Sequence, residues 1–184
     1  MPYLYVALAH YPVTNKNGDV IASAITNLDL HDISRAARTY GVKYFYVVTP
    51  LADQKVLAEK IVAHWTNGTG AAYNPARRNA LELIRLVDTI EDAARDISSR
   101  EAAYPKIVAT GARRHPSGIS YAQLRSLLKE KMPYLLVFGT AWGLAESFID
   151  RADYVLEPIS GTTAYNHLSV RSAAAIMLDR LAGT

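Results

Sequence analysis

The sequence has 184 residues, a formal net charge of +3 at pH 7, a pI near 9.1 and no cysteine. Its balance of hydrophobic and charged residues is ordinary for a globular chain of this length, so we expect a single domain over residues 1–184. The lack of cysteine excludes disulfides and thiolate metal sites, and no apolar run approaches the roughly 20 residues that a membrane-spanning helix needs. The N-terminal stretch lacks the features of a signal peptide, so we expect a cytoplasmic protein, and the basic charge is compatible with an RNA partner.

Along the chain, predicted strands alternate with predicted helices. Six segments have the apolar, β-rich composition of buried strands: residues 3–9, 44–48, 83–87, 106–110, 134–138 and 154–156. Helical spacing, capping residues or proline starts mark the segments between them: residues 29–40, 53–65, a short helix from Pro75, and residues 89–100, 120–131, 144–151 and 170–181.

The boundaries in this pattern rest on caps, glycines and short apolar runs. Asp29 is placed to cap the first helix, which Gly41 ends. The short apolar run 20–24 is of uncertain type. Residues 83–87 could continue the preceding helix, but a strand is favoured because a new helix begins near Thr89.

The alternation predicts an α/β fold with a parallel sheet of about six strands and helices on both faces. Ligands of such sheets bind outside the carboxyl ends of the strands. Three strand ends are rich in glycine and small polar residues: Thr110-Gly111, Gly139 to Gly143, and Pro158 to Gly161. The sequence therefore predicts a small-molecule site formed by these three ends.

A dinucleotide-binding domain would place its glycine-rich turn directly after the first strand. Here the first strand ends in His10-Tyr11-Pro12, and the chain has no phosphate-binding P-loop motif. A further hypothesis is an α/β enzyme that uses a different nucleotide. Only the general architecture supports it.

Three C-terminal segments, FGTAWGL, LEPISG and NHLSVRSAAAIMLDRL, carry a family resemblance. In this order they resemble the cofactor loops of the SPOUT (α/β trefoil-knot) RNA methyltransferases. The strings NLDLHDISRAARTYGV and YNPARR are similar to those of bacterial single-domain SPOUT proteins assigned as RNA methyltransferases that depend on S-adenosylmethionine (SAM). The resemblance covers essentially the whole chain, and its specificity comes from the combination of segments.

The resemblance implies a C-terminal trefoil knot, SAM bound by the knotted loops, a homodimer, and a methyl group transferred to structured RNA such as tRNA or rRNA. An alternative is a silent trefoil-knot protein that binds SAM or RNA without transfer. The cofactor-binding residues expected on this basis are Thr110, Gly111, Phe138, Gly139, Thr140, Gly143, Leu156, Pro158, Ile159, Gly161, Asn166, Leu168 and Ser169.

Two residues are candidates for catalysis. Arg35 matches the arginine that the ribose-methylating branch of the family carries six residues before a glycine, and His167 is a possible proton acceptor near neutral pH. Three positions depart from that branch: Ala141 stands in the place of a glutamate, and Ser169 and Arg171 stand in the places of asparagine and serine. Both a base nitrogen and the ribose 2′-oxygen therefore remain open as the methyl acceptor.

Two pairs of basic residues are candidates for contact with RNA phosphates: Arg77 with Arg78, and Arg113 with Arg114. The alternative for both pairs is an ordinary basic surface that binds no RNA. We expect no metal site, because the five histidines are scattered and lack metal-ligand spacing.

Overall fold

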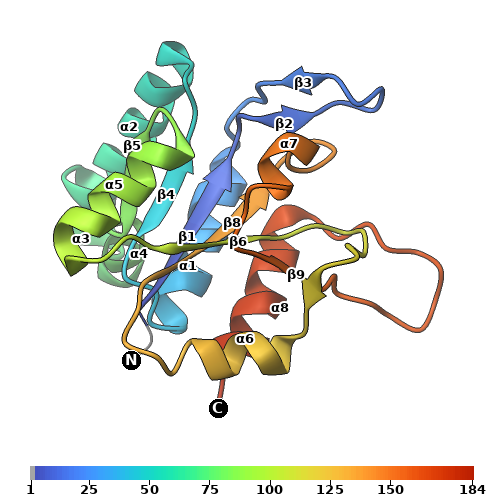
Figure 1. The fold of residues 1–184 in the computed structure, drawn as a ribbon. Coiled ribbons are helices and arrows are strands. Elements are labelled where there is room, and N and C mark those ends of the chain that lie inside the picture. The colour runs from blue at the N-terminus through green and yellow to red at the C-terminus, as the bar shows by residue number, and fades with distance from the viewer. Residues whose placement is uncertain (1–2) are drawn as a thin grey trace.

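The structure is a computed structural model that describes residues 3–184. Within that range seven parallel strands form the central sheet (Figure 1). They are β1 (Leu4–Ala9), β4 (Phe45–Val48), β5 (Ile84–Val87), β6 (Lys106–Ala109), β7 (Gly118–Ile119), β8 (Tyr134–Gly139) and β9 (Tyr154–Leu156). Their order across the sheet is β5-β4-β1-β8-β6-β9-β7, and a separate antiparallel hairpin consists of β2 (Val13–Thr14) and β3 (Val20–Ile21).

The helices are α1 (Asn27–Thr39), α2 (Ala52–Thr66), α3 (Thr69–Tyr73), α4 (Pro75–Leu81), α5 (Ile90–Glu101), α6 (Tyr121–Leu127), α7 (Glu146–Ile149) and α8 (Val170–Ala182). Helices α1 to α7 occupy connections between strands, and α8 follows the last strand, β9. No helix in the described part of the chain is both long and apolar enough to cross a bilayer.

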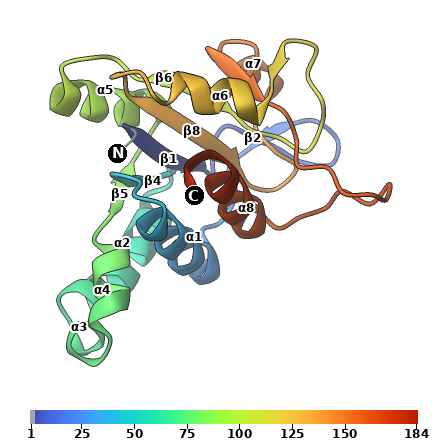
Figure 2. The same ribbon diagram turned by 90° about the horizontal axis from the view of Figure 1, so that it is seen from below.

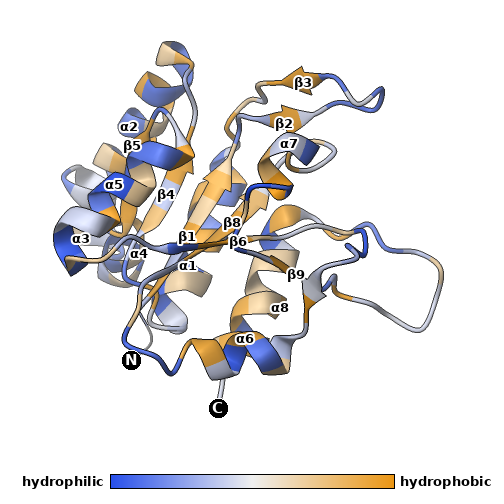
Figure 3. Ribbon diagram, viewed as in Figure 1, coloured by the Kyte–Doolittle hydropathy of each residue, from blue (hydrophilic) through white to orange (hydrophobic). Residues whose placement is uncertain are grey.

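The sheet separates two hydrophobic cores. Helices α1 and α8 lie side by side on one face, whereas α5 lies on the other (Figure 2). Alternate residues of each strand point to opposite faces, so in β1 Val6 joins the α1 and α8 core and Ala7 joins the α5 and α7 core. Figure 3 shows the central strands as the most hydrophobic part of the ribbon, as expected for a parallel sheet covered on both faces.

The predicted α/β fold is confirmed, and so is the disputed strand at residues 83–87. Two local features differ from the prediction. The N-cap of α1 is Thr26, whose hydroxyl accepts a hydrogen bond from the backbone N–H of Asp29, so Asp29 lies inside the helix rather than capping it. Strand β7 and the β2–β3 hairpin were not predicted, because two-residue strands are too short to show a period-2 pattern. The trefoil knot stays a prediction.

Candidate functional site

Three loops leave the carboxyl ends of neighbouring strands. They follow β6, β8 and β9, cover residues 110–117, 140–145 and 157–169, and are called the site loops below. Because β8, β6 and β9 are adjacent and parallel, the loops begin at one edge of the sheet. The side-chain amide of Asn166 donates a hydrogen bond of 2.9 Å to the carbonyl of Ala112, which ties the third loop to the first. Between β9 and α8 the third loop reaches away from the sheet before it returns (Figure 1).

The loop after β8 is a tight turn. A Cβ atom on Gly139 would lie 2.5 Å from the backbone nitrogen of Leu144, so only glycine fits there without moving the loop. Ala141 and Gly143 both have positive φ angles, of 52° and 107°, and the N–H of Gly143 closes the turn on the carbonyl of Thr140 at 2.9 Å. The predicted glycine at position 139 is therefore required by the turn itself, whether or not a ligand is bound.

The β2–β3 hairpin braces this turn from outside. The N–H of Thr14 donates to the carbonyl of Gly143 at 2.9 Å, and the carbonyl of Thr14 accepts from the N–H of Trp142 at 3.0 Å. The indole of Trp142 remains exposed. This contact could not be predicted from the sequence, because residues 14 and 143 lie far apart along the chain and residues 15–19 have the composition of a polar loop.

A buried histidine lies beneath the same turn. His10 follows β1, is fully buried, and contacts the hydroxyl of Ser23 through Nδ1 at 3.0 Å, while Nε2 has no partner among the described residues. Ser23 in turn bonds the hydroxyl of Thr140, which also donates to the carbonyl of Ala9 at 3.1 Å. Burial lowers the pKa of His10 to about 4, so the ring is neutral at pH 7, although Asp29 opposes the shift.

His10 was not among the predicted site residues. Its only signal in the sequence is a histidine placed directly after a buried strand, on the strand next to β8. The residue connects β1, through Ser23, to the predicted cofactor residue Thr140, so it supports the β8 turn from the side of the sheet.

The predicted cofactor residues divide into two groups by exposure. Six have buried or internally bonded side chains: Phe138 and Leu156 in the core, Pro158 and the half-buried Ile159 beside it, Thr110 bonded to the carbonyl of Val137, and Thr140 in the histidine network. Ser169 is the N-cap of α8 and accepts the N–H of Ser172. Gly111, Gly161 and Leu168 are exposed, and a Cβ on Gly143 or Gly161 would meet no atom within 4 Å.

This arrangement fits SAM. Adenine needs apolar contact and backbone hydrogen bonds, and the third site loop carries both the exposed apolar side chain of Leu168, 47% exposed, and open backbone at Gly161. Trp142 adds a second exposed apolar surface on the loop after β8. A separate cavity of about 110 Å³ between α5 and α7 contains none of the predicted cofactor residues.

The two catalytic candidates lie on different elements. Arg35 is exposed on α1, and His167 is exposed on the third site loop with its ring centroid 5.7 Å from that of Tyr165. Among the described residues, neither side chain forms a hydrogen bond or ion pair with the other or with the site loops. Arg171, by contrast, joins α8 to α1 through ion pairs to Asp29 at 3.3 Å and Asp32 at 3.5 Å.

The four predicted RNA-binding arginines have different surroundings. Arg77 stacks over the ring of Trp65, with its guanidinium carbon 4.6 Å from the ring centroid, and Arg78 pairs with Glu82 at 2.8 Å. Arg113 and Arg114 are exposed on the first site loop and form no ion pair in the part of the chain that the structure describes. The second pair is thus the one free to meet a phosphate beside the site loops.

In α/β domains, cofactors bind at the carboxyl ends of adjacent parallel strands. The three site loops lie at such ends, so the chain is of the class of α/β cofactor-binding domains. Residues 3–183 match a protein family described as SAM-dependent RNA methyltransferase, and the chain belongs to this family. Its fold resembles that of the SpoU methyltransferase AviRb from Streptomyces viridochromogenes in complex with AdoMet, with a TM-score of 0.57 and 17% identity over 99% of this chain and 58% of that one. The prediction of a SAM-dependent RNA methyltransferase family is confirmed, and the predicted fold agrees with that of the SpoU methyltransferase.

Two relatives match nearly the whole of this chain but different shares of their own length. A protein of Oleidesulfovibrio alaskensis named tRNA (guanine-N(1)-)-methyltransferase is 47% identical over 180 residues, which are 98% of this chain but only 42% of that protein. An uncharacterized protein of Aquifex aeolicus is 38% identical over 97% of this chain and 87% of its own length. The chain thus spans less than half of the named relative.

Proposed function

We propose that this chain transfers a methyl group from SAM to a nucleotide of structured RNA, with tRNA or rRNA as the substrate. The observation that carries the proposal is the convergence of the three site loops at one edge of the sheet, in a chain that matches the family over residues 3–183. On this proposal residues 1–184 are one methyltransferase domain, and the protein works in the cytoplasm, where its RNA is found.

When bound, SAM supplies a methyl group already activated by the positive charge on sulfur, so the protein mainly has to hold the acceptor in line. Positioning of this kind supplies on the order of 7–11 kcal/mol in the best cases. Gly111, Gly143 and Gly161 allow close approach of backbone to the cofactor, and Leu168 contacts its adenine. Arg113 and Arg114 hold RNA phosphates beside the first site loop, and His167 accepts the proton that the acceptor loses.

Arg35 acts in this proposal through a second copy of the chain. Leu28, which is 58% exposed, lies at the start of α1, two turns before Arg35. The ion pair between Arg171 and Asp29 holds this end of α1 against α8. A dimer formed over this surface would cover Leu28 and place Arg35 against the partner.

The relatives' printed activity suggests which RNA to test first. The O. alaskensis protein is named for a guanine-N1 reaction on tRNA, and more than half of it lies outside the match. The named reaction can therefore belong to either part of that protein. We propose tRNA as the first substrate and leave the acceptor atom to be read from the product.

The test uses the full chain, labelled SAM, and total tRNA and rRNA from cells that lack this protein. We expect label in RNA, and mass spectrometry of the digested nucleosides separates a base-methylated guanosine from a 2′-O-methylated one. Arg35→Ala should abolish transfer while SAM binding, measured by calorimetry, is unchanged. Absence of SAM binding by the wild-type chain would refute the cofactor assignment itself.

A silent binding protein is the second candidate. One observation favours it. Ala141 occupies the position where the ribose-methylating branch has glutamate, so no carboxylate is present there. The residue has a left-handed backbone conformation, with φ 52°. SAM binding of normal affinity with no label in any RNA would support this candidate and reject the enzyme.

A further inference from the structure

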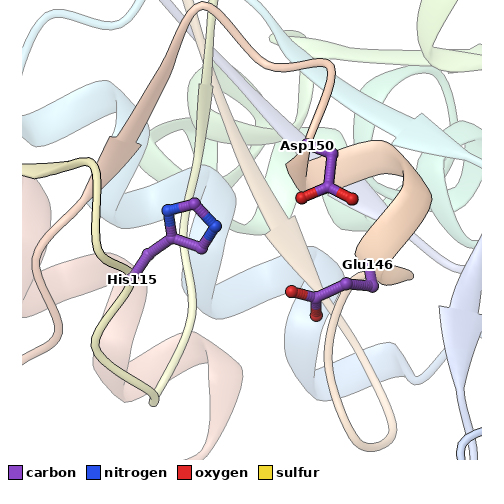
Figure 4. A group of neighbouring side chains, drawn as sticks. All are labelled: His115, Glu146 and Asp150. Carbon is purple, nitrogen blue, oxygen red and sulfur yellow. The ribbon is translucent and has the colours of Figure 1, made fainter.

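Three metal-binding side chains meet beside the site loops. His115 lies on the loop after β6, whereas Glu146 is the first residue of α7 and Asp150 is its C-cap. One ligand atom from each lies within 4.8 Å of the ligand atoms of the other two. Figure 4 shows the imidazole and both carboxylates turned toward a common space, with the histidine on one side and the helix on the other.

The three ligand atoms are near enough to share one ion after a small movement. Metal–nitrogen and metal–oxygen bonds of about 2.1 Å place opposite ligands about 4.2 Å apart and ligands at the tetrahedral angle about 3.4 Å apart. With all three atoms within 4.8 Å of one another, the side chains have to close by about 1.4 Å at most. Glu146 and Asp150 are exposed, so their side chains can rotate by that amount without disturbing the core.

The two carboxylates lie on one short helix, and no cation is paired with either of them in the described part of the chain. Residues four apart on a helix are neighbours, and like charges there repel. Some carboxylates elsewhere are paired with a cation, such as Glu82 with Arg78 and Asp153 with Lys106, whereas others, such as Glu59, have no ion pair among the described residues. Over residues 3–184 no lysine or arginine pairs with Glu146 or Asp150, and Arg151 is turned away to the carbonyl of Ser147.

The histidine is held in an orientation that suits a ligand. Its Nδ1 lies 2.9 Å from the hydroxyl of Ser117 and accepts a longer hydrogen bond of 3.4 Å from the backbone N–H of Ser117. In the other tautomer Nδ1 donates its proton to the hydroxyl and the lone pair of Nε2 becomes available, and an ion bound at Nε2 would select this tautomer. No ion pair of 4.0 Å or less joins His115 to either carboxylate among the described residues, so the space between them is not closed by direct contact.

We propose that His115, Glu146 and Asp150 form a binding site for a divalent first-row transition ion. One imidazole nitrogen with two carboxylate oxygens suits Mn²⁺ or Zn²⁺ better than Mg²⁺, which prefers oxygen ligands alone. The ion neutralises the two carboxylates and fixes the loop that carries Arg113 and Arg114 against α7. Water fills the remaining coordination positions. The proposal concerns ion binding and does not depend on methyl transfer.

The test is a titration of the tag-free, metal-stripped full chain with Mn²⁺, followed by the electron paramagnetic resonance signal of free Mn²⁺, with Zn²⁺ measured by calorimetry. We expect one ion per chain and weaker binding of Mg²⁺. Glu146→Gln and Asp150→Asn should each weaken Mn²⁺ binding by more than about tenfold. Glu59→Gln, an exposed carboxylate on α2 changed in the same way, should bind as the wild type does.

Both carboxylates are exposed, so the variants should fold, which circular dichroism and a thermal melt can verify. Stoichiometric Mn²⁺ or Zn²⁺ binding that survives both substitutions, or no stoichiometric binding of either ion, would overturn the proposal and leave the cluster as solvated surface charge. The titration contains neither SAM nor RNA, so this failure would be distinct from a failure of the proposed methyl transfer.

Discussion

At the scale of single residues, His10 is a titratable group whose pKa shift falls in an accessible pH range. It is fully buried beneath the turn that follows β8, and burial lowers its pKa to about 4, against 6.5 in the unfolded chain. Between these two values the unfolded chain binds the proton and the folded chain does not. Folding stability therefore rises with pH from about 4 to about 6.5 and is independent of this group above that window.

The difference of about 2.5 pKa units corresponds to a change of about 3 kcal/mol across the window. We expect His10→Gln to remove this contribution, so that urea unfolding at pH 4.5, 5.5, 6.5 and 7.5 gives a shallower pH dependence than the wild type. His167→Gln, at an exposed position, is the matched control and should keep the wild-type slope. An unchanged slope in the His10 variant would contradict the assignment.

Two glycines of the site loops have opposite steric surroundings. A methyl group on Gly139 would lie 2.5 Å from a backbone nitrogen, whereas one on Gly161 would meet nothing within 4 Å. We expect Gly139→Ala to lower the free energy of unfolding by about 1–3 kcal/mol and to weaken SAM binding, because the turn must shift. Gly161→Ala should change stability by less than about 0.5 kcal/mol. Chemical denaturation of both variants checks the contrast, and equal effects would show that the turn adapts.

At the scale of elements, α1 and α8 are joined by the ion pair between Arg171 and Asp29. Asp29 is nearly buried and Arg171 is about one third exposed. Arg171→Ala leaves the carboxylate without its cation, and we expect a loss of about 1–2 kcal/mol, between the values for exposed and buried pairs. Asp32→Asn removes only the exposed half of the network at 3.5 Å and should cost less than about 0.5 kcal/mol. Equal losses in the two variants would show that burial of Asp29 does not matter.

The first site loop carries the two arginines that we expect to bind RNA. Replacing both Arg113 and Arg114 by glutamine should weaken RNA binding and reduce the slope of log K against log salt by about 1–2, because each phosphate contact contributes nearly one unit. Arg78→Gln, in which an arginine already paired with Glu82 is lost, should leave the slope unchanged. Filter-binding at several salt concentrations measures both, and a larger effect of Arg78 would move the RNA surface to α4.

At the scale of the whole molecule, the strand and helix order follows from the sequence because its signals are local. Ser120 and Thr89 begin helices with capping boxes, and the apolar runs of the sheet are continuous. The position of the three site loops follows as well, since glycine-rich strand ends of a parallel sheet must meet at one edge.

Contacts between distant segments could not be predicted in the same way. Thr14 braces Gly143 across 129 positions, and His115 approaches Glu146 from a different loop. The expectation of no metal site considered histidine spacing alone, which does not register a cluster of one histidine with two carboxylates. Likewise, the sequence does not show that Arg77 stacks on Trp65 or that Arg78 pairs with Glu82, because these contacts form only in the packed structure.

The order of the strands also constrains how the protein can be made. β1 is synthesised first, but one of its two edges pairs with β8, which is synthesised much later. Both neighbours of β6, which are β8 and β9, also follow it in the chain. A nascent chain that stops before residue 134 therefore carries β1 with one unpaired, hydrophobic edge, the kind of edge that pairs with other chains. The same late strands carry two of the three site loops, so the site forms last, and premature termination should give an aggregating fragment rather than a partly active one.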